Sequence, residues 1–290
     1  MAARLLPYCP GGKTLIKLRI ALWLLLVVTA CNCSSGVTSV APGDGKPGDT
    51  APASVLPIDP REPVLAASIR SILEKEHLLR HAVDDEISTK AFARYLKMVD
   101  PDKMFLLAGD VAELERFTTE IDDELESGRF ELAHSGAALF AKRLTRIEQI
   151  VSRRLGEPFD FSVDESFETD PKKRTYGKTE DELAERWRKA LKFEVLQRVV
   201  RMEDTAEALA KAAAEEKKNP PDAGVAAAKP PDIPKTAKAR EVKARADLAK
   251  SYAGRFARLA AVEPLDPVEP YLNAILSVYD PHTAYLKPAT

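Results

Sequence analysis

An apolar pattern with a period of about 3.6 residues runs through most of this 290-residue chain and constrains its fold more than any other feature. One long stripe consists of Ala133, Ala137, Phe140, Leu144, Ile147 and Val151. Residues at this spacing share one face of a helix and can bury it against a neighbouring element. No convincing pair of alternating strands accompanies the stripes. We therefore predict an all-α fold, an irregular helical bundle over residues 58–278.

Five further stripes predict most of the remaining helices. Their apolar positions are Leu65, Ile69, Ile72, Leu73 and Leu79; Ile87, Ala91, Phe92, Tyr95 and Leu96; Leu114, Phe117, Ile121 and Leu125; Leu183, Trp187, Leu191, Val195, Val199, Met202 and Leu209; and Val242, Leu248, Tyr252, Phe256 and Leu259. The second helix should end before Asp100-Pro101, and the helix from Val242 should stop at Pro264. A last helix is expected from Asp266 to Val278.

Two of these helices begin with the pattern of a capping box, in which an N-cap side chain and the acid three residues later satisfy free amides. The pairs are Asp110 with Glu113 and Thr179 with Glu182. We expect each pair to mark a helix N-terminus.

Two stretches interrupt the helical pattern. Residues 155–179 are polar but contain Phe159, Phe161 and Phe167, which predicts a loop pinned across the bundle rather than an idle connection. Residues 211–238 are rich in Ala, Lys and Pro, and their two Pro-Pro pairs break the helical tendency of the rest. We predict two helix ends there, separated by a disordered insertion.

The N-terminus has the pattern of a secretion signal. Lys13, Lys17 and Arg19 lie shortly before the 11-residue apolar run Ile20–Ala30, which is too short to span a bilayer. The run ends in Val-Thr-Ala-Cys, which resembles a bacterial lipobox and predicts lipidation of Cys31; alternatively, Cys31 lies near an ordinary signal-peptidase cut. Residues 1–30 would then be a lipoprotein signal peptide, and the Ser-, Gly- and Pro-rich residues 31–57 a flexible tether.

Charge and cysteine content exclude some classes of site. The predicted signal holds four of the 43 basic residues and no acid, so the remainder has 39 basic and 45 acidic residues, a net charge of −6. This balance argues against a nucleic-acid surface. All three cysteines precede residue 34, so the folded region holds no disulfide and no thiolate metal site.

The remaining candidates for chemistry are weak. His77 and His81 are four residues apart, a spacing that allows a shared metal on one helix, but the HExxH glutamate is missing and solvated histidines are the simpler interpretation. Asp280 is two residues from His282 and could orient it as a base, although no nucleophile or glycine-rich oxyanion loop follows. We therefore predict no catalytic, cofactor-binding or metal-binding residues and no cofactor.

Three segments together resemble a known family in order and spacing. They are YLKMVDPDKMFLLAGDVAEL (95–114), ELAERWRKALKFEVL (182–196) and YLNAILSVYDPHTAYLKP (271–288). They are similar to the N-terminal domain of the tail-specific (C-terminal processing) serine proteases. In that family a helical domain is followed by a PDZ domain, and residues 279–290 resemble the start of this junction. The junction residues are Tyr279, Asp280, Pro281, His282 and Thr283.

The resemblance implies an envelope endopeptidase that degrades proteins from apolar C-terminal tails with a serine activated by a lysine. Those catalytic parts normally follow the PDZ domain, so we expect this chain to stop before them, to be inactive alone, and to act as a scaffold that contacts protein substrates or adaptors. The Ala-, Lys- and Pro-rich insertion is a second departure from the family pattern.

Two alternatives remain open. The chain could be a stand-alone, non-catalytic helical lipoprotein that binds proteins in the periplasm, and then Tyr285 and Leu286 should dock on the bundle. A metal-dependent helical enzyme would instead need tight zinc binding by the two histidines.

The expected location is the periplasmic side of a bacterial cell envelope, with the membrane contacted through the N-terminal lipid. Asn32 is not the Asp that is associated with inner-membrane retention, which favours the outer membrane.

Overall fold

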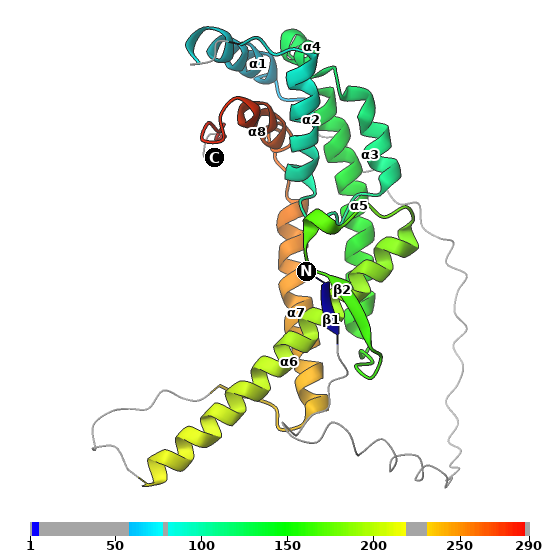
Figure 1. Ribbon diagram of the computed structural model, residues 1–290, viewed down its shortest axis with the longest axis vertical. Helices are drawn as coiled ribbons and strands as arrows, with labels where there is room; N and C mark the ends of the chain where they lie inside the picture. Colours follow the sequence, from blue (N-terminus) through cyan, green and yellow to red (C-terminus); the bar gives the residue numbers. More distant parts are fainter. Residues whose placement is uncertain (1, 6–57, 78–80, 219–230, 288–290) are drawn as a thin grey trace, which may run out of the picture. The chain divides into compact units, whose positions relative to one another are not determined.

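A computed structural model describes residues 2–5, 58–77, 81–218 and 231–287 and confirms the all-α class (Figure 1). The helices are α1 (Glu62–Ser71), α2 (Asp85–Val99), α3 (Ala108–Leu114), α4 (Ile121–Ser127), α5 (Glu131–Gly156), α6 (Glu180–Lys218), α7 (Ala237–Ala260) and α8 (Val268–Tyr279). Short helical turns η1 (Ile72–Glu76), η2 (Glu115–Phe117) and η3 (Pro171–Lys173) and strands β1 (Ala2–Leu5) and β2 (Glu165–Glu168) complete the described elements.

One hydrophobic core joins α1, α2, α4 and α8 to the start of α5. The apolar helix α8 packs along α2, and its Tyr271 stacks on Phe130 and Tyr95 with ring centroids 4.9 and 6.4 Å apart. All three aromatic side chains are at most 1 % exposed. Large buried rings of this kind contribute strongly to stability through the apolar area that they remove from water.

A second group of contacts joins α5, α6 and α7, which pack against each other. Their shared interior contains the predicted stripe positions Ile147, Leu191, Val195 and Leu248, all at most 1 % exposed. Helix α5 takes part in both groups, because Leu132 and Ala133 near its start belong to the first core and Ile147 faces the second. The same continuous helix therefore couples the two packing regions (Figure 1).

Three local expectations were wrong. The first helix continues as the π-helical turn η1 and stops at Glu76, and this change of register leaves Ile72 42 % exposed. The stripe from Leu114 to Leu125 is buried as predicted but is divided among α3, η2 and α4. Asp110 is not an N-cap, because it lies at the third position of α3 and accepts the amide of Leu107 at 2.8 Å.

The other predicted cap is confirmed, since Thr179 Oγ1 accepts the Glu182 amide at 3.2 Å at the start of α6. Helix α6 continues to Lys218, so the first part of the predicted insertion 211–238 is helical. Helix α7 begins at Ala237, and residues 219–230 lie outside the described residues.

No alternating pattern predicts the two-stranded ladder that the structure contains. Strand β1 pairs antiparallel with β2, with Ala3 opposite Phe167 and Leu5 opposite Glu165. Residues 2–5 fall inside the predicted signal peptide, and the rest of that segment and the tether 31–57 lie outside the described residues. No helix in the described ranges has the length and apolar character needed to cross a membrane.

Replacing Gly136 with alanine is expected to destabilise the first core. A Cβ at this position would lie 2.1 Å from the hydroxyl oxygen of Tyr95, which is buried and hydrogen-bonded to the Leu132 carbonyl at 3.4 Å. Overpacking of this kind costs about 1–3 kcal/mol in the free energy of unfolding, measured by urea denaturation. Gly109→Ala is the control, because its Cβ would meet nothing within 4 Å; equal effects of the two changes would contradict the prediction.

The buried carboxyl of Glu124 should make stability fall as pH rises. Burial raises the pKa of Glu124 from 4.5 to about 7, and its Oε2 has no hydrogen-bond partner among the described residues. The folded state therefore holds the proton more tightly, so its stabilisation is complete below pH 4.5 and is lost as pH rises through about 7. The loss should amount to about 2–4 kcal/mol.

Glu124→Gln should remove this slope in thermal unfolding measured from pH 4.5 to 8. Glu126→Gln is the matched control, because the Glu126 side chain is 75 % exposed. An unchanged slope in the Glu124 variant would refute the assignment.

Candidate functional site

The predicted junction residues form a structured turn at the end of α8. Tyr279 is 8 % exposed and donates its hydroxyl to the His81 carbonyl at 2.9 Å. The Asp280 carboxylate accepts the His282 amide and the Thr283 hydroxyl, both at 3.0 Å. These bonds lower the pKa of Asp280, with the His282 amide as the main cause. Asp280 therefore binds the backbone of His282 rather than orienting its imidazole.

The turn continues into a segment that docks only in part. The side chain of Asn273 forms two hydrogen bonds with the backbone of Tyr285, accepting its N–H at 2.7 Å and donating to its carbonyl at 3.1 Å. Tyr285 packs against the first core, whereas Leu286 is 80 % exposed. Lys287 then pairs with Glu263 at 3.1 Å and with Asp266. Docking through both Tyr285 and Leu286 was the expectation for a self-sufficient domain, and only Tyr285 meets it.

The histidine pair does not have the predicted geometry. The helical turn ends at Glu76, and His77 is extended, so His77 and His81 do not lie on one helix. His77 stacks edge-on against Tyr279 at 5.4 Å, and His81 Nδ1 lies 2.8 Å from the Ala82 carbonyl. No cluster of three metal-ligating side chains occurs among the described residues. The prediction for Cys31 concerns a residue outside them.

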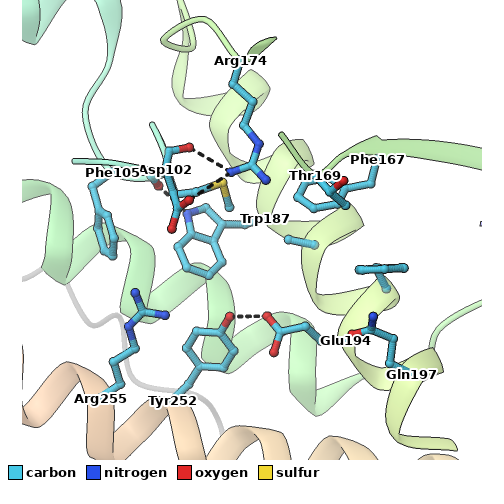
Figure 2. Close-up of a pocket in the computed structure, with 13 residues that line it drawn as sticks. Asp102, Phe105, Phe167, Thr169, Arg174, Trp187, Glu194, Gln197, Tyr252 and Arg255 are labelled. Atoms are coloured by element: carbon cyan, nitrogen blue, oxygen red, sulfur yellow. Dashed lines mark hydrogen bonds and ion pairs between the residues drawn. The ribbon is translucent and has the colours of Figure 1, made fainter. Parts of the chain in front are cut away.

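A cavity of about 260 Å³, here called the aromatic pocket, opens between α6, α7, β2 and the turn that precedes α3 (Figure 2). Its wall is built around Trp187, which is 2 % exposed and stacks edge-on against Phe105 and Tyr252 at 5.8 and 5.7 Å. Phe167 of β2 and Phe193 of α6 form another wall, with centroids 6.3 Å apart. Aromatic rings therefore form two of its walls, and polar side chains complete the lining.

The polar groups of the aromatic pocket differ in how they are satisfied. Tyr252 donates its hydroxyl to Glu194 at 2.6 Å, and Arg174 donates to the Asp102 carbonyl at 2.9 Å (Figure 2). Arg255, which is exposed and points toward the pocket in Figure 2, has no hydrogen bond or ion pair with any described residue. One uncommitted cation thus lies beside an aromatic cavity.

The turn preceding α3 supplies part of the pocket's lining, including Met104 and Phe105. The Asp100 carboxylate, 1 % exposed, accepts the amides of Met104, Phe105 and Leu106 at 2.9, 3.0 and 2.9 Å. The Met104 carbonyl in turn accepts the indole N–H of Trp187 at 2.6 Å. Because the indole donor is already satisfied inside the protein, the ring of Trp187 acts only as an apolar surface.

Strand β2, which forms the pocket's side wall, is held by buried charge. Glu165 pairs with Arg188, 3.1 Å from Oε1 to NH1, and with Lys192, which is 1 % exposed. Hydrogen bonds from Arg188 lower the pKa of Glu165 to about 2. A second, more open cavity of about 420 Å³ lies between β2 and α6 and shares Phe167 and Arg174 with the aromatic pocket.

The apolar spacing predicts the framework of this pocket but not the pocket itself. Trp187 and Tyr252 were predicted only as stripe positions, and Phe167 as a pinning residue. Arg255 and Glu194 carried no recognisable signal, because charged residues on a helix are usually solvated. Only the resemblance of segments 95–114 and 182–196 to the protease family indicated that this region is of functional interest.

Comparison with known proteins decides the family. The sequence profile described as "Tail specific protease N-terminal domain" matches residues 69–289. The chain belongs to this family.

A relative is the "Tail-specific protease" of Haemophilus influenzae, which is 26 % identical over 220 residues, or 75 % of this chain. The chain spans only 26 % of the length of that relative. The aromatic pocket, β2 and the turn after α8 all lie within the segment that matches the tail-specific protease N-terminal domain.

Substituting Asn273 is expected to release the segment after α8 without unfolding the domain. In Asn273→Ala the Tyr285 amide loses its acceptor, so hydrogen exchange of this amide should accelerate by about tenfold or more, as measured by exchange and mass spectrometry. Ser277→Ala serves as the control, since its hydroxyl donates to the Ala274 carbonyl at 2.9 Å, within α8. Equal exchange in the two variants would show that Asn273 does not hold the segment.

Proposed function

We propose that this domain serves a tail-specific serine endopeptidase of the bacterial envelope, in which it acts as a scaffold and contacts protein substrates or adaptors. The observation that carries the proposal is the family match over residues 69–289. The matched region is about a quarter of the relative's length, so we assign peptide-bond cleavage to other parts of such a protease. The aromatic pocket supports a contacting role, because a cavity walled by rings and polar side chains with the exposed Arg255 beside it suits protein recognition.

The location is proposed from the sequence alone. A lipid on Cys31 and the tether 31–57 would hold the domain on the periplasmic side of a membrane, with the outer membrane favoured by Asn32.

The alternative is a stand-alone, non-catalytic lipoprotein that binds proteins in the periplasm. The docking of Tyr285 through Asn273 supports it, since this contact closes the end of α8 without a further domain. The exposure of Leu286 supports the protease context, because an apolar side chain there is available to a following module.

The mass of the native protein distinguishes the protease domain from the stand-alone lipoprotein. An immunoblot of source-cell membranes with antibody against residues 60–260 should detect a band well above the 31.9 kDa of this chain if the domain is part of a protease. In that case, deleting residues 69–289 from the native gene should slow turnover of a substrate with an apolar C-terminal tail in a pulse-chase experiment. A band at or below 31.9 kDa would favour the stand-alone lipoprotein.

Lipid attachment has its own test with a matched control. Cells fed radiolabelled palmitate should label the wild-type chain and Cys33→Ser but not Cys31→Ser. Labelling of the Cys31 variant would refute the proposed anchor.

A further inference from the structure

Four basic side chains line the second cavity, the one of about 420 Å³ between β2 and α6. Lys173 ends the turn η3 and Arg174 follows it, whereas Arg186 and Lys189 belong to α6. The two residues of α6 are three apart, a spacing that places them next to each other on a helix surface. Cations from two separate segments therefore converge on one space, which we call the basic cavity.

Arg174 is fixed in this cavity mainly by main-chain acceptors. Its guanidinium lies over the ring of Phe167, 5.0 Å from the centroid, and donates to the carbonyls of Glu168 and Asp102 at 2.8 and 2.9 Å. The ion pair with the Asp102 carboxylate is long, at 3.9 Å. Carbonyl acceptors orient a guanidinium without cancelling its charge, so Arg174 remains a strong source of positive potential.

Arg186 is the second half-buried guanidinium of the cavity. It donates to the Lys103 carbonyl at 2.6 Å and has no ion pair with any residue that the structure describes. Burial and the neighbouring charge of Arg174 lower the pKa of Arg186, and Asp100 and Glu182 oppose this effect. Two like charges thus repel each other in a partly desolvated place, and an anion bound between them would relieve the repulsion.

The two lysines of the basic cavity are uncommitted. Neither Lys173 nor Lys189 has a hydrogen bond or an ion pair within the described part of the chain. Lys173 is exposed and Lys189 is half-buried, so both ammonium groups can reach a ligand in the cavity at little cost in desolvation.

The carboxylates in the lining are engaged elsewhere. Glu185 forms a two-point ion pair, at 2.8 and 2.7 Å, with Arg188, which is not part of the lining. Glu182 and Glu168 each accept a backbone amide, at 2.7 and 2.9 Å. Four basic side chains therefore face three carboxylates, of which Arg188 neutralises one, and the lining keeps an excess of two positive charges.

We propose that the basic cavity binds a phosphate group, held between the cations of the η3 segment and those of α6. A phosphate monoester carries up to two negative charges and three acceptor oxygens, which matches donors that approach from two sides. A carboxylate offers one charge and two oxygens. Guanidinium and ammonium groups are the usual phosphate ligands in proteins. This site goes beyond the proposed protein-contacting role and does not depend on it.

The first test is calorimetric titration of the full chain with inorganic phosphate at low salt. The wild-type chain should show saturable binding, and Lys189→Gln should weaken it by about tenfold or more, because a hydrogen bond to a charged group is lost. Lys142→Gln is the matched control, since this exposed lysine of α5 lies outside both cavities. No saturable binding, or equal weakening by the two substitutions, would overturn the proposal.

The convergence of two segments has its own test. Lys173→Gln changes an exposed side chain, so the fold is not at risk, and it should weaken phosphate binding as Lys189→Gln does. A normal affinity in the Lys173 variant would show that the η3 segment does not take part and would contradict a site shared with α6.

The last titrations examine the ligand class and its source. Acetate should bind at least about tenfold more weakly than phosphate, because it has one charge less and fewer acceptors; equal affinity would overturn the assignment to a phosphate group. Glycerol 3-phosphate and the water-soluble lipid dihexanoyl phosphatidic acid present the same phosphate monoester. Tighter binding of the lipid would assign the site to a lipid headgroup, and equal binding to a soluble phosphate ester. Failure of both to bind would refute the site.

Discussion

The carboxylate of Asp100 accepts three consecutive backbone N–H groups, and the two packing regions of the domain depend on the turn that it closes. Burial raises the pKa of Asp100, and the three amide donors oppose that effect. Lys103 within the turn has a positive φ of 51°, a conformation that a non-glycine residue adopts only when its surroundings enforce it. The carbonyls of Lys103 and Met104 in this bend accept hydrogen bonds from Arg186 and from the Trp187 indole, both at 2.6 Å. A turn that ends α2 in the first core thereby fixes α6 in the second.

A group of ion pairs around Arg143 also connects the helices of the two packing regions. Arg143 of α5 binds the Asp110 carboxylate with two hydrogen bonds, at 2.7 and 2.9 Å, and also reaches Glu180 of α6 at 3.0 Å. Asp110 and Arg143 are both largely buried, at 7 and 11 % side-chain exposure. A bidentate hydrogen-bonded pair of this kind fixes the orientation of the guanidinium and the carboxylate as well as the distance between them. Helices α3, α5 and α6 therefore meet at a defined angle, which a purely apolar contact would leave less strictly set.

Much of this architecture could be predicted from apolar spacing, because the period specifies which faces are buried. The stripe residues of α2 and most of those of α5 and α6 are buried or half-buried as expected. Spacing does not reveal where a helix breaks when burial continues across the break. A helical spacing continues through Leu114, Phe117, Ile121 and Leu125. The backbone nevertheless changes along this stretch from α3 to the turn η2 and then to α4. The aromatic pocket could not be predicted either, because it joins residues from four segments. It also includes Arg255, and only the residues around this arginine in the folded protein indicate that it belongs to a pocket.

Hydrogen bonds within the protein satisfy the polar groups of the two central rings of the aromatic pocket, Trp187 and Tyr252. The indole N–H of Trp187 binds the Met104 carbonyl, and the Tyr252 hydroxyl binds Glu194. An unsatisfied polar group there would draw in water and would have to be desolvated before an apolar side chain could enter. Because these bonds already exist, a side chain that packs on the two rings breaks neither of them, whereas Arg174, Glu194 and Arg255 add polar surface elsewhere in the lining. The same turn that joins the two cores thus also prepares the cavity beside β2.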